Sequence, residues 1–194
     1  MIVGMLVWFF ISPCITGGVN SIHVKAGVIT KMKFPVSILP TTVVMKELFN
    51  HLFMLVIVYI VLLIRGMRPS IYNLQIVYYM VCAIIFSISI GMVTSVLNMI
   101  TRDVKKMVSA SIRILMYLTP ILWTMDKLPE SMQKIMMCNP IFYIVEGYRD
   151  SFFYHQGALS NIGSMITFWT SIMFLFILGS KLMYDFKNKL IDLI

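Results

Sequence analysis

A short polar cluster interrupts an otherwise apolar part of the chain, and its members are Lys46, Glu47, Asn50 and His51. Residues four apart on a helix lie on the same face, so we expect Lys46 to meet Asn50 and Glu47 to meet His51. Because a charge that faces lipid costs several kcal/mol, these groups should face the interior of a helix bundle or a watery path. The pattern fits a buried structural network and a substrate path equally well.

A second candidate is Arg113, which lies within the apolar run 107–125. Its long side chain could reach the headgroup region, pair with Glu47 or Asp103, or bind the diphosphate of a substrate. Anchoring or pairing is favoured over contact with a substrate.

A third group of charges lies near the end of the segment 119–154. On a helix, Glu146 can meet Arg149 at i, i+3 and Asp150 at i, i+4. An ion pair there would hold a short helix in place, and it needs no substrate.

Several other chemistries are excluded or disfavoured by the sequence. It contains no GxxxxGK[ST] motif, so the chain cannot bind ATP through a P-loop of its own. The potential metal ligands are scattered: Cys14, Cys82 and Cys138 show no CxxC spacing, and His23, His51 and His155 are far apart. We therefore expect no catalytic residue, no metal site and no cofactor in this chain. If ATP drives the process, a separate chain must bind the ATP and Mg²⁺.

The elements that position these residues are expected to be membrane helices. Hydrophobic residues make up 59% of the 194 and charged residues 12%, against roughly a quarter charged in soluble domains. We predict an all-α, polytopic membrane helical bundle in a single domain, residues 1–194. About five spans are expected: 1–22, 36–64, 71–98, 107–125 and 162–184. Pro120 should kink the fourth span, and the small residues Ser87, Ser89 and Gly91 should allow close packing in the third.

The first apolar run is short for a span and begins without the basic region of a signal peptide. It has the pattern of the second half of a helix, so we expect a further span upstream of it.

The segment 126–155 predicts a re-entrant hairpin of two short helices. Pro129 and Pro140 each suit a first helical position, and Asn139 is a good N-cap for the second helix. From Pro129 to Cys138 the helix would be about 15 Å long, near half of a hydrocarbon core. An amphipathic loop on the membrane surface is the alternative.

Three sets of motif residues carry a family resemblance. They are Gly17, Gly18, Asn20, Ser21, Ile22, Phe34, Pro35, Ile38, Leu39 and Pro40; then Asn98, Arg102, Asp103 and Val104; then Pro120, Leu122, Trp123, Leu128, Pro129, Glu130, Asn139, Pro140 and Val145 to Asp150. Together they resemble the polysaccharide-type ABC-2 exporter permeases, most nearly those that translocate teichoic acid. The resemblance covers essentially all of the chain, whereas the family's N-terminal interfacial helix and first span have no counterpart.

The resemblance implies a role for two segments. The segment 23–35 would be the contact that couples the chain to its ATPase, through Gly27, Lys31, Lys33, Phe34 and Pro35. The hairpin 126–155 would be an extracytoplasmic gate that includes Trp123, Pro129, Asn139, Pro140, Glu146, Gly147, Tyr148 and Arg149. A plain basic loop remains the alternative for 23–35.

The resemblance also implies partners and a substrate. The chain would form a homodimer, bind a separate ATP-binding subunit, and move polyprenyl-diphosphate-linked teichoic acid, an anionic glycopolymer, to the outer face of the cell membrane. A permease for capsular or O-antigen polysaccharide is the nearest alternative. A membrane-embedded enzyme on lipid-linked sugars and a secondary transporter are less favoured, because the acids are dispersed and no inverted repeat is visible.

Orientation follows from the distribution of basic residues. One side of the predicted bundle carries Lys25, Lys31, Lys33, Lys46, Arg102, Lys105, Lys106, Lys181, Lys187 and Lys189; the other carries Arg65, Arg68, Lys127, Lys134 and Arg149. The richer side is expected to be cytoplasmic. The hairpin would then lie outside the cell membrane and the C-terminus inside.

Overall fold

A computed structural model describes residues 1–29, 35–123, 125, 129–158 and 160–192. Throughout these residues the regular structure is helical. The elements in chain order are α1 (Ile2–Gly18), α2 (Ser21–Ile29), α3 (Ile38–Ile64), η1 (Ile71–Leu74), α4 (Gln75–Ile100), α5 (Asp103–Leu118), α6 (Glu130–Met137), α7 (Pro140–Arg149), η3 (Asp150–Tyr154) and α8 (Ile162–Asp192). The expected all-α fold is confirmed.

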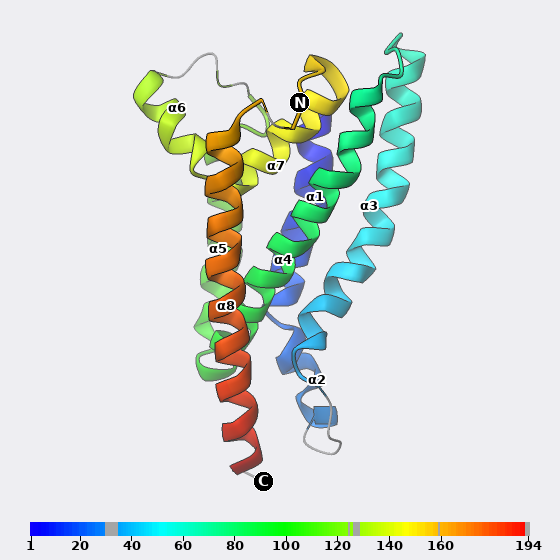
Figure 1. Cartoon of the computed structure of the whole chain (residues 1–194). Helices are drawn as coiled ribbons and strands as arrows, with labels where there is room; N and C mark the ends of the chain where they lie inside the picture. The colour runs from blue at the N-terminus through cyan, green and yellow to red at the C-terminus, as the bar shows by residue number, and fades with distance from the viewer. Residues whose placement is uncertain (30–34, 124, 126–128, 159, 193–194) are drawn as a thin grey trace.

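The long helices run up and down between two ends of the molecule (Figure 1). The first residue, α6 and α7 lie at one end, which we call the hairpin end. Helix α2 and the last turns of α8 lie at the other, which we call the α2 end (Figure 1). The described helices of the two segments to which the resemblance assigns roles, α2 on one hand and α6 with α7 on the other, are therefore at opposite ends of the bundle.

Three of the described helices are long and apolar enough to cross a membrane: Ile38–Ile64, Ile71–Ile100 and Ile162–Phe186. Helix α1 with the start of α2 forms a fourth candidate, bent by 42°. The chain is thus a multi-pass membrane protein with a helical bundle, as expected. The division into five spans within one domain stays a prediction.

Helix α5 differs from the span expected over 107–125. It has 16 residues and ends at Leu118, and Thr119 after it is extended, with ψ 139°. A residue before proline avoids the helical region, so the helix stops ahead of Pro120 instead of bending at it. The expected kink is wrong.

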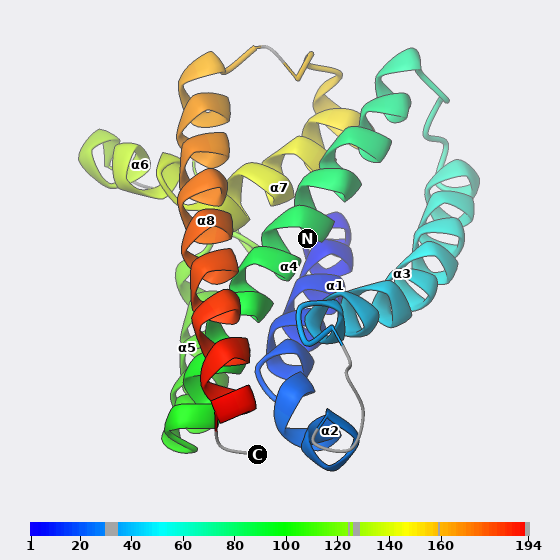
Figure 2. The same cartoon turned by 60° about the horizontal axis from the view of Figure 1, so that its bottom comes forward.

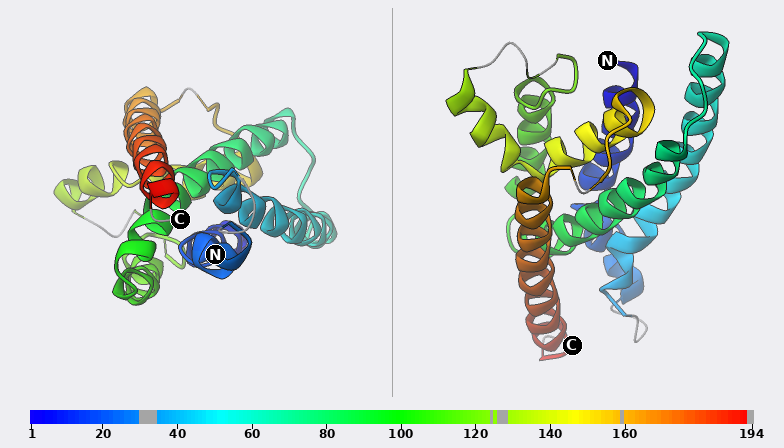
Figure 3. Two further views of the ribbon diagram at one scale, coloured as in Figure 1. Left: turned by 90° about the horizontal axis from the view of Figure 1, so that it is seen from below. Right: turned by 45° about the horizontal axis from the view of Figure 1, so that its top comes forward.

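Helices α1 and α4 lie between α3 on one side and α5 and α8 on the other (Figures 2 and 3). Most of α1 is buried, with Phe10, Ile11 and Cys14 almost inaccessible. Helix α4 packs against α1, α3, α5, α7 and α8, and the small residues expected to allow this, Ser87, Ser89 and Gly91, are all buried.

The outer helices α3 and α8 leave large apolar side chains uncovered. Examples are Phe53 and Ile64 on α3 and Met173 and Phe174 on α8, each more than two-thirds exposed. Such apolar surface suits lipid better than water.

Candidate functional site

The second helix of the hairpin, α7, begins as the sequence predicts. The Asn139 side chain accepts a hydrogen bond from the backbone N–H of Ile141 at 3.0 Å, which makes it the N-cap, and Pro140 is the first helical residue. The Asn139 amide also donates to the hydroxyl of the buried Thr119 at 3.0 Å. The cap therefore fixes the start of α7 to the segment that follows α5.

The end of α7 is held by Arg149. Its Nη1 lies 3.0 Å from Oε2 of Glu146, so the expected ion pair is confirmed. Its Nη2 donates to the backbone carbonyl oxygens of Ile121 at 3.0 Å and Trp123 at 3.2 Å. The Arg149 side chain is 5% exposed and that of Glu146 32%. A buried guanidinium with three acceptors ties α7 to the chain segment that leaves α5.

Helix α1 approaches this contact closely. A Cβ atom on Gly4 would lie 2.6 Å from the carbonyl oxygen of Ile121 and 3.3 Å from Nη2 of Arg149. Only glycine leaves room here for the helix backbone beside the arginine.

Gly147 allows a second close approach, between α7 and α4. A Cβ atom on it would lie 2.0 Å from Cε1 of the Tyr79 ring, which is itself buried. The ring of Tyr79 thus packs directly on the backbone of α7.

Tyr148 joins α7 to α3. Its hydroxyl lies 2.9 Å from Nε2 of His51, and both side chains are buried. The ring of Phe10 of α1 also packs against that of His51, with centroids 4.9 Å apart.

Tyr143 connects α7 to both α4 and α8. Its hydroxyl is 3.2 Å from that of Tyr78, which accepts a hydrogen bond from Nε1 of Trp169 at 3.0 Å. The ring of Tyr143 also packs on that of Phe168 in α8, with centroids 4.7 Å apart. Helix α7 therefore contacts α1, α3, α4 and α8 directly. Apart from Pro140 and Glu146, all of its residues are buried.

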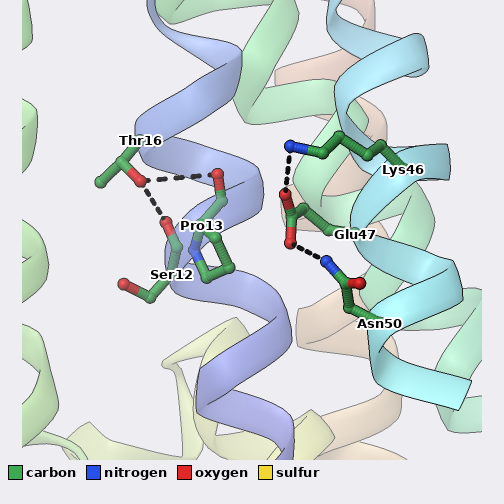
Figure 4. A network of polar contacts seen from close by, with 6 residues as sticks. All are labelled: Ser12, Pro13, Thr16, Lys46, Glu47 and Asn50. Atoms are coloured by element: carbon green, nitrogen blue, oxygen red, sulfur yellow. Dashed lines mark hydrogen bonds and ion pairs between the residues drawn. The ribbon is translucent and has the colours of Figure 1, made fainter. Parts of the chain in front are cut away.

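The polar cluster on α3 is paired differently from the sequence prediction (Figure 4). Glu47 is the common partner: its carboxylate lies 3.7 Å from Nζ of Lys46 and accepts a hydrogen bond from Asn50 at 3.1 Å. The predicted pairs Lys46–Asn50 and Glu47–His51 are wrong, because His51 turns toward Tyr148. The Glu47 side chain is 16% exposed whereas Lys46 is 78% exposed.

On α1, the same close-up shows Thr16 bonded to its own helix: its hydroxyl donates to the carbonyls of Ser12 at 2.9 Å and Pro13 at 3.4 Å (Figure 4). These contacts on α1 and α3 satisfy polar groups locally, which favours the structural network over the substrate path.

The first helix of the hairpin, α6, is exposed. Pro129 precedes its first residue instead of occupying it, and none of its described side chains is buried. Its apolar residues Met132 and Ile135 are 52% and 66% exposed. Nearby, Nε1 of Trp123 donates to the carbonyl of Tyr117 at 3.1 Å, so this ring caps the end of α5.

The other site residues lie outside the hairpin. Arg113 is exposed on α5 and its Nε donates to the carbonyl of Ser109 at 3.3 Å. Gly27 belongs to α2, which begins at Ser21, ahead of the predicted coupling segment 23–35. Pro35 is exposed. Lys31, Lys33 and Phe34 lie outside the described residues, so the coupling contact stays a prediction.

Sequence reasoning found the cap and the ion pair of α7 but missed its other attachments, and three of these show why. The backbone acceptors of Arg149, the ring of Tyr79 against Gly147, and the His51–Tyr148 hydrogen bond all join distant parts of the chain. A glycine and a tyrosine inside a helix pattern were the only local signals.

Comparison with known proteins identifies the family. The model of the ABC-2 type transporter family matches residues 1–153. An O-antigen export system permease protein RfbA of Klebsiella pneumoniae is 28% identical over 195 residues, which is 100% of this chain and 74% of that protein. A second such protein of Klebsiella pneumoniae is 31% identical over 78% of this chain, and one of Myxococcus xanthus is 25% identical over 80%. The chain spans 59% and 61% of the lengths of these two relatives. The family model thus matches about four-fifths of this helical membrane chain. The chain belongs to the ABC-2 type transporter family.

Proposed function

We propose that the chain is the membrane subunit of an ATP-driven exporter that moves a lipid-linked polysaccharide from the cytoplasmic to the outer face of the cell membrane. The observation that carries the proposal is the anchored hairpin at one end of a bundle of this family, opposite α2. Such an arrangement provides a gate at one end and a contact for an ATPase at the other. The chain itself needs no covalent chemistry for this task.

The polysaccharide we propose is of the O-antigen class. The sequence resemblance pointed first to teichoic acid, but the relatives described above are named for O-antigen export. Teichoic acid finds no support among them, whereas the O-antigen part of the alternative expectation is supported by their names.

The decisive experiment is a flipping assay in proteoliposomes that contain the permease with a partner ATPase. Fluorescent polyprenyl-diphosphate glycans of the O-antigen type and of the teichoic acid type are compared, with and without ATP. ATP-dependent movement of the O-antigen type supports the proposal, and movement of the teichoic acid type alone would restore the first expectation. Movement without ATPase would point to a secondary transporter, and chemical alteration of the glycan to an enzyme.

We further propose that the hairpin end faces outward and that the C-terminus is cytoplasmic. Lys25 belongs to α2, Lys105 and Lys106 to the first turn of α5, and Lys181 to the second half of α8, which ends at the α2 end (Figure 1). Such basic residues are expected on a cytoplasmic side. The native Cys138 tests this directly, because it is exposed in the hairpin while Cys14 and Cys82 are buried. A membrane-impermeant maleimide should label intact cells or spheroplasts through Cys138, and Cys138→Ser should abolish the label. Labelling only after the membrane is broken would reverse the orientation.

The coupling contact would include Gly27, Lys31, Lys33, Phe34 and Pro35. Reversing the charge at Lys31 and Lys33 together should uncouple ATP hydrolysis from export while leaving membrane insertion intact. A matched double reversal at Lys105 and Lys106 serves as the control for charge on the same side. Export and ATPase stimulation that match the wild type in the Lys31 and Lys33 variant would remove the segment from the contact.

Arg113 is the proposed contact for the substrate diphosphate. Its exposure on α5 leaves the guanidinium available to a ligand or to a second copy of the chain. Arg113→Lys should keep part of the export, since the charge survives and the bidentate geometry does not, whereas Arg113→Gln should abolish it. Normal export by the glutamine variant would make the residue an anchor only.

A further inference from the structure

A pocket lies at the hairpin end, lined by residues of α6, α7, η3, α4 and the start of α8 with the segment before it. Its volume is about 390 Å³, within the range of small-molecule sites. That space would hold about a dozen water molecules at about 30 Å³ each, a volume that a sugar ring with its hydroxyl groups can replace. The residues on which the argument rests are Tyr79, Phe142, Tyr143, Glu146, Asp150 and Ser164.

Two polar groups in this pocket lack partners. The Ser164 side chain is 6% exposed, and its hydroxyl makes no hydrogen bond within the described part of the chain. The Asp150 carboxylate likewise has no hydrogen bond or ion pair to any described residue. Leaving a buried hydroxyl without a hydrogen bond costs free energy, so a ligand or an ordered water is expected to supply the missing hydrogen bond.

The charge of the pocket selects against an anionic ligand. Glu146 and Asp150 line it, and its described lining contains no lysine or arginine. Arg149 is close in sequence, but its guanidinium is directed to Glu146 and to the carbonyls of Ile121 and Trp123. The neighbourhood therefore offers hydrogen-bond acceptors to hydroxyl groups and repels phosphate.

The aromatic side chains that line the pocket suit the C–H groups of a sugar ring. The aromatic residues Tyr79, Phe142 and Tyr143 form part of the wall, and the negative face of such a ring attracts the weakly positive C–H groups of a sugar. Carboxylate and hydroxyl oxygens beside aromatic rings are the combination that a neutral, hydroxyl-rich ring needs.

We infer that this pocket binds a neutral sugar unit of the exported polysaccharide at the outer end of its route. The inference rests on the proposed function and adds a ligand site on the chain itself. It also favours an uncharged glycan over an anionic glycopolymer as the exported chain.

Saturation-transfer NMR on the purified permease–ATPase complex tests the site. The probes are the methyl glycosides of glucose, galactose, mannose and rhamnose, with glycerol 3-phosphate as the anionic comparison. At least one glycoside should bind, and glycerol 3-phosphate should bind more weakly or not at all. Asp150→Asn should weaken glycoside binding about tenfold through loss of a charge-assisted acceptor, and Ser164→Ala about fivefold.

Two matched variants control for general effects. Ser171→Ala removes another α8 hydroxyl, one that donates to the carbonyl of Thr167 away from the pocket. Asp103→Asn removes an acid at the α2 end, paired there with Lys106. Both should bind glycosides as the wild type does, and melting curves should show that all four variants are folded.

The outcomes separate the inference from the proposed function. If no glycoside binds better than glycerol 3-phosphate, or if both pocket variants bind as tightly as the wild type, the inference is wrong. Export of the polysaccharide by the same preparations would then leave the proposed function standing. A wild-type complex that flips no lipid-linked glycan would instead remove the proposed function.

Discussion

The two helices of the hairpin, α6 and α7, begin alike but lie in different surroundings. Each starts at or just after a proline, and they are eight and ten residues long. Helix α7 is buried on nearly all sides and attached to α1, α3, α4 and α8, whereas α6 packs mainly on α7 and exposes its apolar residues. A proline and a cap thus set where a short helix begins, and tertiary contacts decide whether it is held.

The largest effect should come from Arg149. Arg149→Gln leaves Glu146 and two backbone carbonyls without their charged donor, so we expect a loss of about 3–5 kcal/mol in the free energy of unfolding. Glu146→Gln should cost less because Glu146 is more exposed. The double variant should lose less than the sum of the two, with leak or lost export in each single variant. Strictly additive losses in denaturing-detergent titrations would show that the pair does not act as a unit.

Gly147→Ala should come next. In an open helix this change stabilises by about 1 kcal/mol, but here the new Cβ would overlap the Tyr79 ring, and overpacking typically costs about 1–3 kcal/mol. Gly157→Ala is the matched control, because nothing lies within 4 Å of its Cβ position. Melting temperatures of the two variants in detergent check the difference. If both glycines tolerate alanine equally, α7 is not packed on Tyr79.

Tyr148→Phe should have a smaller effect, about 1–2 kcal/mol. It removes only the hydroxyl that bonds His51 and leaves that buried ring nitrogen without its partner. Tyr117→Phe, on the exposed face of α5, should be neutral. Equal stabilities of these two variants would argue against the link between α3 and α7.

A modest pH dependence is expected from Asp150. Burial, followed by the nearby negative charge of Glu146, raises the pKa of the Asp150 carboxyl to about 6. Tyr79 also faces it from α4. The folded state therefore holds the Asp150 proton more tightly than the unfolded chain does. The stability that this proton adds to the folded state is fully present below about pH 4 and is lost as the pH rises through about 6. The melting temperature should therefore fall between pH 5 and pH 7.5 by more in the wild type than in Asp150→Asn. The same fall in both would assign it to other groups.

The smallest effect should be in α6. Lys134→Ala, at an exposed position, should change the free energy of unfolding by no more than about 0.5 kcal/mol. A loss as large as that of Tyr148→Phe would mean that α6 is covered by a partner in the assembled transporter, and the contrast between the two helices would then apply to the single chain only.

The parts of the site that could be predicted from sequence depend on near neighbours in the chain. The cap at Asn139, the proline at the start of α7 and the Glu146–Arg149 pair each involve residues at most three apart, so spacing alone predicts them. The same holds for the all-α membrane fold, since long apolar runs have few alternatives.

The failed predictions have two different causes. His51 was expected to pair with Glu47 four residues away, but Tyr148, 97 residues further along, holds it instead. Local spacing says which pairs are possible and not which distant group competes for them. At Pro120 the error was of another kind: proline permits a kink or an end, and the extended Thr119 selects the end.

The attachment of Arg149 to carbonyl oxygens has an evolutionary consequence. Both of these acceptors belong to the backbone, which every amino acid supplies, so substitutions at Ile121 and Trp123 leave the acceptors themselves in place. Glu146, by contrast, contributes through its side chain. Over divergence we therefore expect the identities at 121 and 123 to drift within the limits of packing, while an arginine at 149 and a glycine at 4 persist together.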